Sequence, residues 1–206
     1  MSKEILTRIL YVTIILAILG FLILNLFGMN ILDSTGFLKI PSLLSGIVLF
    51  WTFYIAIGWK LPLLKYIVYK ENLNGTWFGT YTSKNFTSNE EFNGNISVVI
   101  RQNFLNLNVK SFTENYVNHS FGEVLNYDSK SDSHQLIYLY SQNEFNPTDD
   151  NYRKGTSELN LHCNVDEDEF FGDFWTNHNS KGFLNLKKIS KKHCKSFSET
   201  NKLVAK

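Results

Sequence analysis

The sequence lacks the features that mark an enzyme or a protein that binds duplex nucleic acid. Its net charge is only +1 over 206 residues, whereas duplex binding needs a strongly basic face. It contains no phosphate-binding glycine loop, no dinucleotide-binding glycine turn and no nucleophile elbow. The five histidines are scattered, and none forms a metal-protease pair. We therefore expect no catalysis and no duplex nucleic-acid partner.

Cysteines and metal-ligand clusters are also scarce. Cys163 and Cys194 are the only cysteines, and neither needs a disulfide partner, which suits a reducing compartment. His162 is adjacent to Cys163, but neighbours on a strand point to opposite faces, and no second ligand pair follows at zinc spacing. The acidic run Asp166–Glu169 lacks the pattern of an EF-hand loop and is interpreted as a hairpin tip. We expect no metal and no resident cofactor.

Charge is missing altogether from two long apolar runs, Ile9–Leu32 and Ile40–Trp59. Each run approaches the roughly 20 apolar residues that span a bilayer as a helix. Both are apolar on all faces, which argues against the alternative of a buried hairpin in a soluble protein. We predict two transmembrane helices, Ile5–Phe27 and Pro41–Trp59.

Basic residues flank this helical pair on one side. Lys3 and Arg8 precede the first helix, three lysines follow the second between residues 60 and 70, and the connector carries only Lys39 beside Asp33. The positive-inside rule then places both ends of the chain in the cytoplasm. We expect a hairpin over residues 1–60 and an amphipathic connector on the membrane surface over 61–70.

The second apolar run also contains two small residues on one side of the predicted helix. Ser42 and Gly46 form a small-xxx-small pair, and small residues allow helices to approach closely in lipid.

The hydrophobic period changes from helical to alternating after Glu71. Leu105, Leu107 and Val109 share one face of a predicted strand, with Asn106 and Asn108 opposite, as in a half-buried strand. The predicted strands are Thr76–Ser83, Asn93–Gln102, Leu105–Lys110, Tyr116–Tyr127, Gln135–Ser141, Arg153–His162, Phe170–Thr176 and Phe183–Ile189. We predict an all-β, eight-stranded antiparallel up-and-down barrel, lipocalin-like, over residues 71–189, because closure removes exposed edges. Residues 190–206 are expected to form a basic, disordered tail.

One mouth of the predicted barrel gathers aromatic and cationic side chains. Odd strands run away from the membrane, so their far ends meet the starts of the even strands. The predicted ligand-binding residues are Tyr81, Lys110, Tyr140, Arg153, Trp175 and Asn177. Arg153 shares a phase with Ser157 and Leu159 and is expected to point inward, whereas the phases of Tyr140 and Trp175 stay open. Aromatic planes beside a cation suit a planar base and a phosphate; the alternative is an ordinary barrel core and rim.

The first strand carries the sequence "LNGTWFGTY", which begins at Leu73. Trp77, Gly79 and Tyr81 fall on one face, so Trp77 would plug the barrel and Gly79 would leave room for it. Two predicted membrane helices, a short connector, then Gly75–Trp77–Gly79–Tyr81 and a β-rich domain resemble the two-transmembrane β-barrel effectors of bacterial CBASS antiphage defence. That family's domain is described as SMODS-associating, with two membrane spans and rich in β-strands.

The resemblance covers the chain except its basic tail, and it implies a function. A partner nucleotidyltransferase would make a cyclic dinucleotide in response to infection. The barrel would bind this messenger, the protein would form homo-oligomers, and the clustered helices would disrupt the inner membrane in abortive infection. A multi-pass protein in contact with membrane lipid is implied. A cyclic dinucleotide is large for an eight-stranded interior, so we expect it in the mouth or across two barrels.

Two other functions fit the same architecture. A membrane-tethered, lipocalin-like carrier would hold a small apolar ligand in the barrel. A membrane scaffold would bind a protein partner on the barrel instead. The cations predicted at the mouth favour an anionic ligand over an apolar one.

Overall fold

The structure is a computed structural model that describes residues 3–26, 40–68, 70–128, 133–142, 153–163 and 168–205. The expected connector between the helices and most of the acidic run before Asp168 lie outside these ranges. The chain divides into two compact units, one comprising Met1–Asn72 with Asn103–Leu105 and the other comprising the remainder. Each unit is described by itself.

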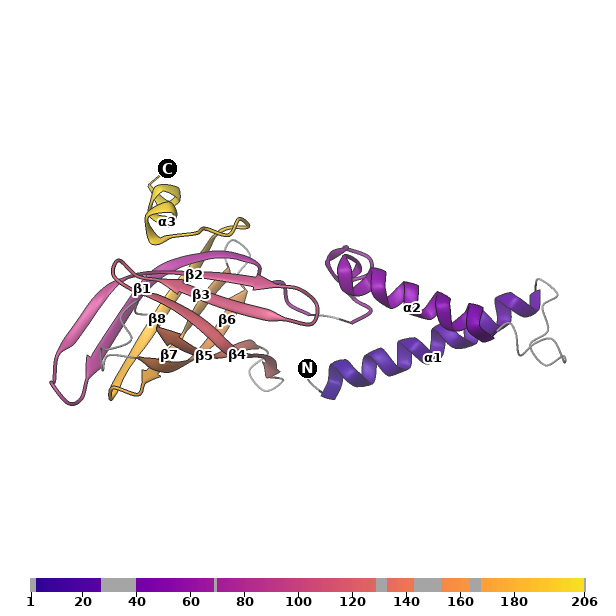
Figure 1. The fold of residues 1–206 in the computed structure, drawn as a ribbon, viewed down its shortest axis with the longest axis horizontal. Coiled ribbons are helices and arrows are strands. Elements are labelled where there is room, and N and C mark those ends of the chain that lie inside the picture. The colour runs from indigo at the N-terminus through magenta and orange to yellow at the C-terminus, as the bar shows by residue number, and fades with distance from the viewer. Residues whose placement is uncertain are drawn as a thin grey trace. The chain divides into compact units, whose positions relative to one another are not determined.

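Two apolar helices form most of the first unit and lie side by side (Figure 1). They are α1 (Lys3–Leu26) and α2 (Ile40–Ala56), and a 3₁₀ turn, η2 (Gly58–Lys60), follows α2. The indole N–H of Trp51 on α2 donates to the Thr13 hydroxyl on α1 at 3.0 Å. The segment Ile5–Leu26 is long and apolar enough to cross a membrane, whereas α2 is a shorter apolar helix of 17 residues.

The second unit is a closed barrel in which each strand pairs antiparallel with its sequence neighbours and β1 pairs with β8. All eight predicted strands are present, so the predicted antiparallel barrel is confirmed, with strand ends displaced by a few residues. The strands are β1 (Gly75–Asn85), β2 (Glu91–Gln102), β3 (Leu107–Phe112), β4 (Val117–Asp128), β5 (Ser133–Gln142), β6 (Lys154–Cys163), β7 (Asp168–Thr176) and β8 (Ser180–Ser190).

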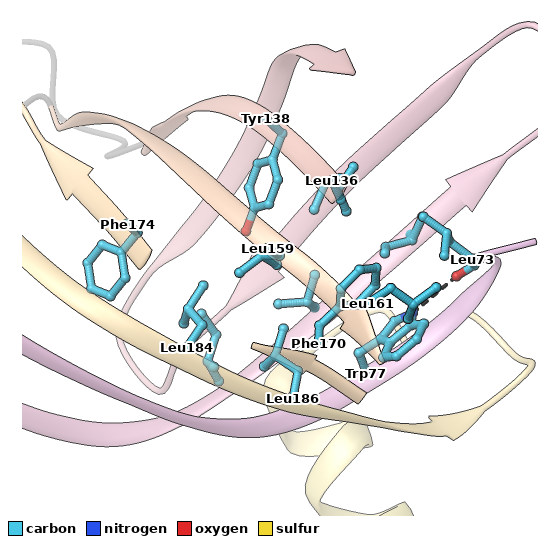
Figure 2. Close-up of a cluster of buried hydrophobic side chains, with 14 residues drawn as sticks. Leu73, Trp77, Leu136, Tyr138, Leu159, Leu161, Phe170, Phe174, Leu184 and Leu186 are labelled. Carbon is cyan, nitrogen blue, oxygen red and sulfur yellow. Dashed lines mark hydrogen bonds between the residues drawn. The ribbon is translucent and has the colours of Figure 1, made fainter. Parts of the chain in front are cut away.

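Trp77 closes one end of the barrel interior, as its phase predicted. Its side chain is fully buried, its indole N–H donates to the Leu73 carbonyl at 3.1 Å, and its ring centroid lies 4.5 Å from that of Phe170. Figure 2 shows these three residues at one end of the core, with Phe174 at the other end and Tyr138 between them. A buried indole with its N–H satisfied combines large apolar burial with no polar cost.

Gly79 serves a different purpose from the predicted one. A β-carbon at this position would lie 1.8 Å from the Asn185 carbonyl oxygen on β8. The missing side chain therefore makes room for the backbone of β8 rather than for Trp77. Gly79 permits the close approach that seals β1 to β8.

The end of the chain also differs from the expected disordered tail over 190–206. Residues Phe197–Val204 form a helix, α3. The hydroxyls of Ser97 on β2 and Thr200 on α3 lie 2.8 Å apart in a buried contact, and Cys194 is buried with its backbone N–H bonded to a threonine hydroxyl of β1. The sequence looked polar because only one side of this short helix contacts the barrel.

Replacing Gly79 by alanine tests the β1–β8 seal. The added methyl group meets backbone atoms, which cannot move without separating the strands. We therefore expect the substitution to lower the free energy of unfolding by about 1–3 kcal/mol or more. The matched control is Gly122→Ala on β4, whose added β-carbon would lie 3.4 Å from the Leu139 side chain, its nearest neighbour outside the adjacent residues. Thermal unfolding of the full-length protein in detergent, followed by circular dichroism, should separate the two variants. Equal melting temperatures would contradict this explanation of Gly79.

Candidate functional site

A cavity of about 360 Å³ opens at the end of the barrel opposite Trp77. Its lining mixes apolar, aromatic and polar side chains. Strands β2, β7 and β8 supply the phenylalanine and aliphatic side chains, β1 adds Tyr81, and the polar residues on this side are Ser83, Asn85, Glu90, Thr176 and Ser180. Strands β3–β6 and the adjoining turns supply three tyrosines, Arg153 and most of the hydroxyl and amide groups; these last form the polar wall, which comprises Ser111, Thr113, Asn115, Asn118, Gln142 and Ser157. A concave site that combines apolar and aromatic side chains with several polar groups is typical of small-molecule binding.

Three aromatic rings of the cavity each lie over a glycine on the neighbouring strand. The register pairs are Tyr81 with Gly94, Tyr140 with Gly155, and Phe174 with Gly182. A β-carbon at these glycines would lie 2.8, 2.4 and 2.5 Å, respectively, from atoms of the paired ring. At Gly182 it would lie closer still, 2.0 Å, to the Thr82 carbonyl oxygen on β1, so this glycine also allows the close approach of β8 to β1. The absent side chains therefore let the rings lie down across the adjacent strand. The sequence positions these three aromatic faces before any ligand arrives.

Tyr138 and Tyr140 project from β5 into the interior and stay protonated far above neutral pH. Burial raises the pKa of Tyr138 to about 12, although a hydrogen bond with Ser157 opposes the rise. Burial also raises the pKa of Tyr140, as does the neighbouring Tyr138, and the positive charge of Arg153 partly offsets this. Both phenols can therefore act as hydrogen-bond donors to an anion at physiological pH.

Arg153 is the single cationic side chain among the described residues that line the cavity. Its guanidinium carbon lies 5.8 Å from the centroid of the Tyr116 ring, a cation–π distance. Its carbonyl accepts a hydrogen bond from the Gln142 N–H at 2.8 Å, which fixes the backbone beside β5. The guanidinium remains exposed at the rim, where it can meet an anion from solution.

The structure brings together three of the six predicted site residues: Tyr81, Tyr140 and Arg153 line the cavity. Lys110 does not. It faces outward into a separate groove with Arg101 and His119, because Val109 and Ser111 on either side of it face inward.

Trp175 and Asn177 are also absent from the cavity lining. Trp175 is 42% exposed on the outer face, since Phe174 and Thr176 take the inward positions of β7. Asn177 ties the end of β7 to β6: its side-chain oxygen accepts from the Lys154 N–H at 2.9 Å.

Sequence reasoning missed the polar wall. Ser111 and Asn118 are short polar residues at strand ends, where turn residues are also common. Alternation from the inward Leu107 and Val109 would have placed Ser111 inside. No comparable signal marked Asn118. No group of three or more possible metal ligands occurs in the part of the chain that the structure describes.

A closed eight-stranded barrel with one plugged end and one open, aromatic and polar mouth defines a small-molecule-binding barrel. Comparison with known families identifies which kind of small-molecule-binding barrel this is. The family described as Cap15, cyclic dinucleotide receptor domain, matches residues 70–188, more than half of the chain. The chain therefore belongs to the Cap15 cyclic dinucleotide receptor domain family, as the resemblance to CBASS effectors predicted. No curated protein matches the chain.

The buried Tyr138 phenol should weaken the fold in alkali. Its pKa lies near 12 in the folded state against about 10 when unfolded, so the unfolded chain loses the proton first as pH rises. Stability is then lost from about pH 10 upward, by at most about 1.4 kcal/mol per pH unit. We expect Tyr138→Phe to show a shallower fall in melting temperature between pH 9 and 11.5 than the unchanged protein. Parallel curves would show that Tyr138 ionises freely.

Proposed function

We propose that this protein is a CBASS antiphage effector whose barrel binds a cyclic dinucleotide at the open mouth. The family assignment supports the ligand class. The location of the ligand site is supported by one observation: Arg153, the aromatic rings that lie over glycines and the polar wall all line the same cavity. No catalytic step is proposed.

The two ligand chemistries match different parts of the cavity. A base can stack on an aromatic face, which is worth about 1–3 kcal/mol, and Tyr81 and Tyr140 supply such faces. A phosphate can accept two parallel hydrogen bonds from the Arg153 guanidinium. At about 360 Å³, the cavity is near the lower end of the roughly 300–1,000 Å³ typical of ligand sites. Part of a cyclic dinucleotide would therefore extend from the mouth.

The helical pair supplies the proposed output. We propose that α1 and α2 both span the bacterial inner membrane, with both ends of the chain in the cytoplasm. A β-carbon at Gly20 on α1 would lie 2.3 Å from the Leu43 side chain of α2, whereas no described atom lies within 4 Å of that position at Gly46. The Ser42–Gly46 side of α2 is thus left open for the helices of another copy.

Ligand binding can promote assembly only if the ligand binds the assembled state more tightly. We propose that the occupied mouth provides this difference, that the protein then forms homo-oligomers, and that the clustered helices disrupt the membrane and kill the infected cell. A partner nucleotidyltransferase would supply the messenger. An apolar-ligand carrier is less well supported, because the hydroxyl and amide groups of the polar wall would lose hydration without compensation.

Arg153→Ala should weaken ligand binding without unfolding the barrel. The full-length protein in detergent is titrated calorimetrically with c-di-AMP, c-di-GMP, c-di-UMP and mixed cyclic dinucleotides. For the tightest of these, loss of a charge-assisted contact should raise Kd about 10–100-fold. The matched control is Arg101→Ala, which removes the same charge from the outer groove. Equal effects of the two variants would show a non-specific charge effect and place the ligand elsewhere.

Membrane disruption is tested separately with dye-loaded vesicles of bacterial phospholipid containing the full-length protein. We expect dye release on adding the tightest-binding cyclic dinucleotide and none on adding its linear hydrolysis product. Arg153→Ala should shift the response to higher ligand concentration by the same factor as its Kd. Tight binding without leakage, at every protein density tried, would separate the receptor from the proposed membrane activity and contradict the latter.

A further inference from the structure

One polar atom on the cavity wall has no hydrogen-bond partner. The side-chain oxygen of Asn118 is buried and unbonded within the described part of the protein. Its amide nitrogen, by contrast, donates to the Ser111 hydroxyl at 3.1 Å. Buried acceptors of this kind are uncommon in folded proteins, because each one loses its hydration.

The strand register places the Asn118 side chain on the cavity wall. Asn118 on β4 lies between Ser111 on β3 and Gln142 on β5, and all three side chains line the cavity. The bond to Ser111 uses one hydrogen of the amide nitrogen, whereas the acceptor capacity of the buried oxygen is wholly unused. The Ser111 hydroxyl accepts that bond and keeps its own hydrogen for donation. The wall therefore offers an acceptor beside a donor.

We propose that Asn118 recognises the hydrogen-bonding edge of one nucleobase: its side-chain oxygen accepts an N–H of the base, and the Ser111 hydroxyl donates to the adjacent base acceptor. This inference rests on the proposed function and assigns specificity within the same cavity. An amide oxygen can only accept, so it repels phosphate oxygens and requires a donor. A base edge carries a donor and an acceptor in fixed positions, and Tyr140 on the neighbouring β5 supplies a face for its ring.

The test is a thermodynamic cycle on the full-length protein in detergent. The tightest-binding member of the cyclic dinucleotide panel is compared with an analogue whose donating base nitrogens are blocked by methylation, such as N3-methyluracil or N1-methylguanine. The unchanged protein should bind the methylated analogue at least tenfold more weakly. Asn118→Leu should bind the unmodified ligand at least tenfold more weakly than the unchanged protein does, and should distinguish the two ligands by less than twofold.

Three further measurements complete the design. Asn95→Leu, an exposed asparagine on β2, is the matched control and should keep the full discrimination. The ligand-free melting temperature of Asn118→Leu should fall only slightly, because the lost bond to the Ser111 hydroxyl is offset by removal of an unpaired buried acceptor; a mainly structural role for Asn118 would lower it by more than the loss of that one bond explains. Asn118→Ser serves as the second variant if the leucine does not fold, and should lose most of the discrimination.

The outcomes separate the two proposals. Undiminished discrimination in the Asn118 variants overturns the base-recognition proposal alone. The base-recognition proposal is also overturned if removing a ribose 2′-hydroxyl from the ligand abolishes binding whereas methylating its bases does not. The hydrogen-bond donor would then belong to the sugar. Failure of every panel member to bind the unchanged, folded protein overturns the proposed function together with this inference.

Discussion

The close pairing of β1 with β8 is the constraint on which the rest of this structure depends. Gly79 allows the Asn185 carbonyl to occupy the space of a side chain, and the seal turns a sheet into a barrel with a definite interior. Closure of the barrel decides which alternate side chains of each strand face the core and which face solvent. Trp77 fills one end of that interior, so the cavity is left at the other end.

The same use of glycine shapes the mouth. Gly94, Gly155 and Gly182 each face an aromatic ring across a strand pair, and each leaves the ring a place on the neighbouring backbone. Each ring therefore lies against the backbone of the neighbouring strand at its glycine. Pre-positioned aromatic faces reduce the ordering cost of binding a planar group, which fits a cyclic dinucleotide receptor domain.

Much of the fold follows from the sequence because alternation and loss of charge are strong signals, and they predicted both helices and all eight strands. The site was predicted less completely. Lys110 was placed by its nearness to a strand end, although its alternation with Val109 already put it outside. Trp175 could not be placed, because both faces of β7 are apolar and only closure decides between them. Asn118 gave no signal, since its importance comes from a missing partner that only three-dimensional packing reveals.

The arrangement separates affinity from selectivity. Arg153 lies exposed at the rim, where it can attract the phosphates shared by every cyclic dinucleotide, and such charge contacts raise affinity without distinguishing bases. Ser111 and Asn118 lie on the buried wall, where an unmatched polar group costs most. A base with the wrong edge would leave the Asn118 oxygen unpaired and lose affinity for that reason. Discrimination by an unsatisfied buried group is stronger than discrimination by fit alone, so the polar wall, rather than the cation, is where one messenger would be told from another.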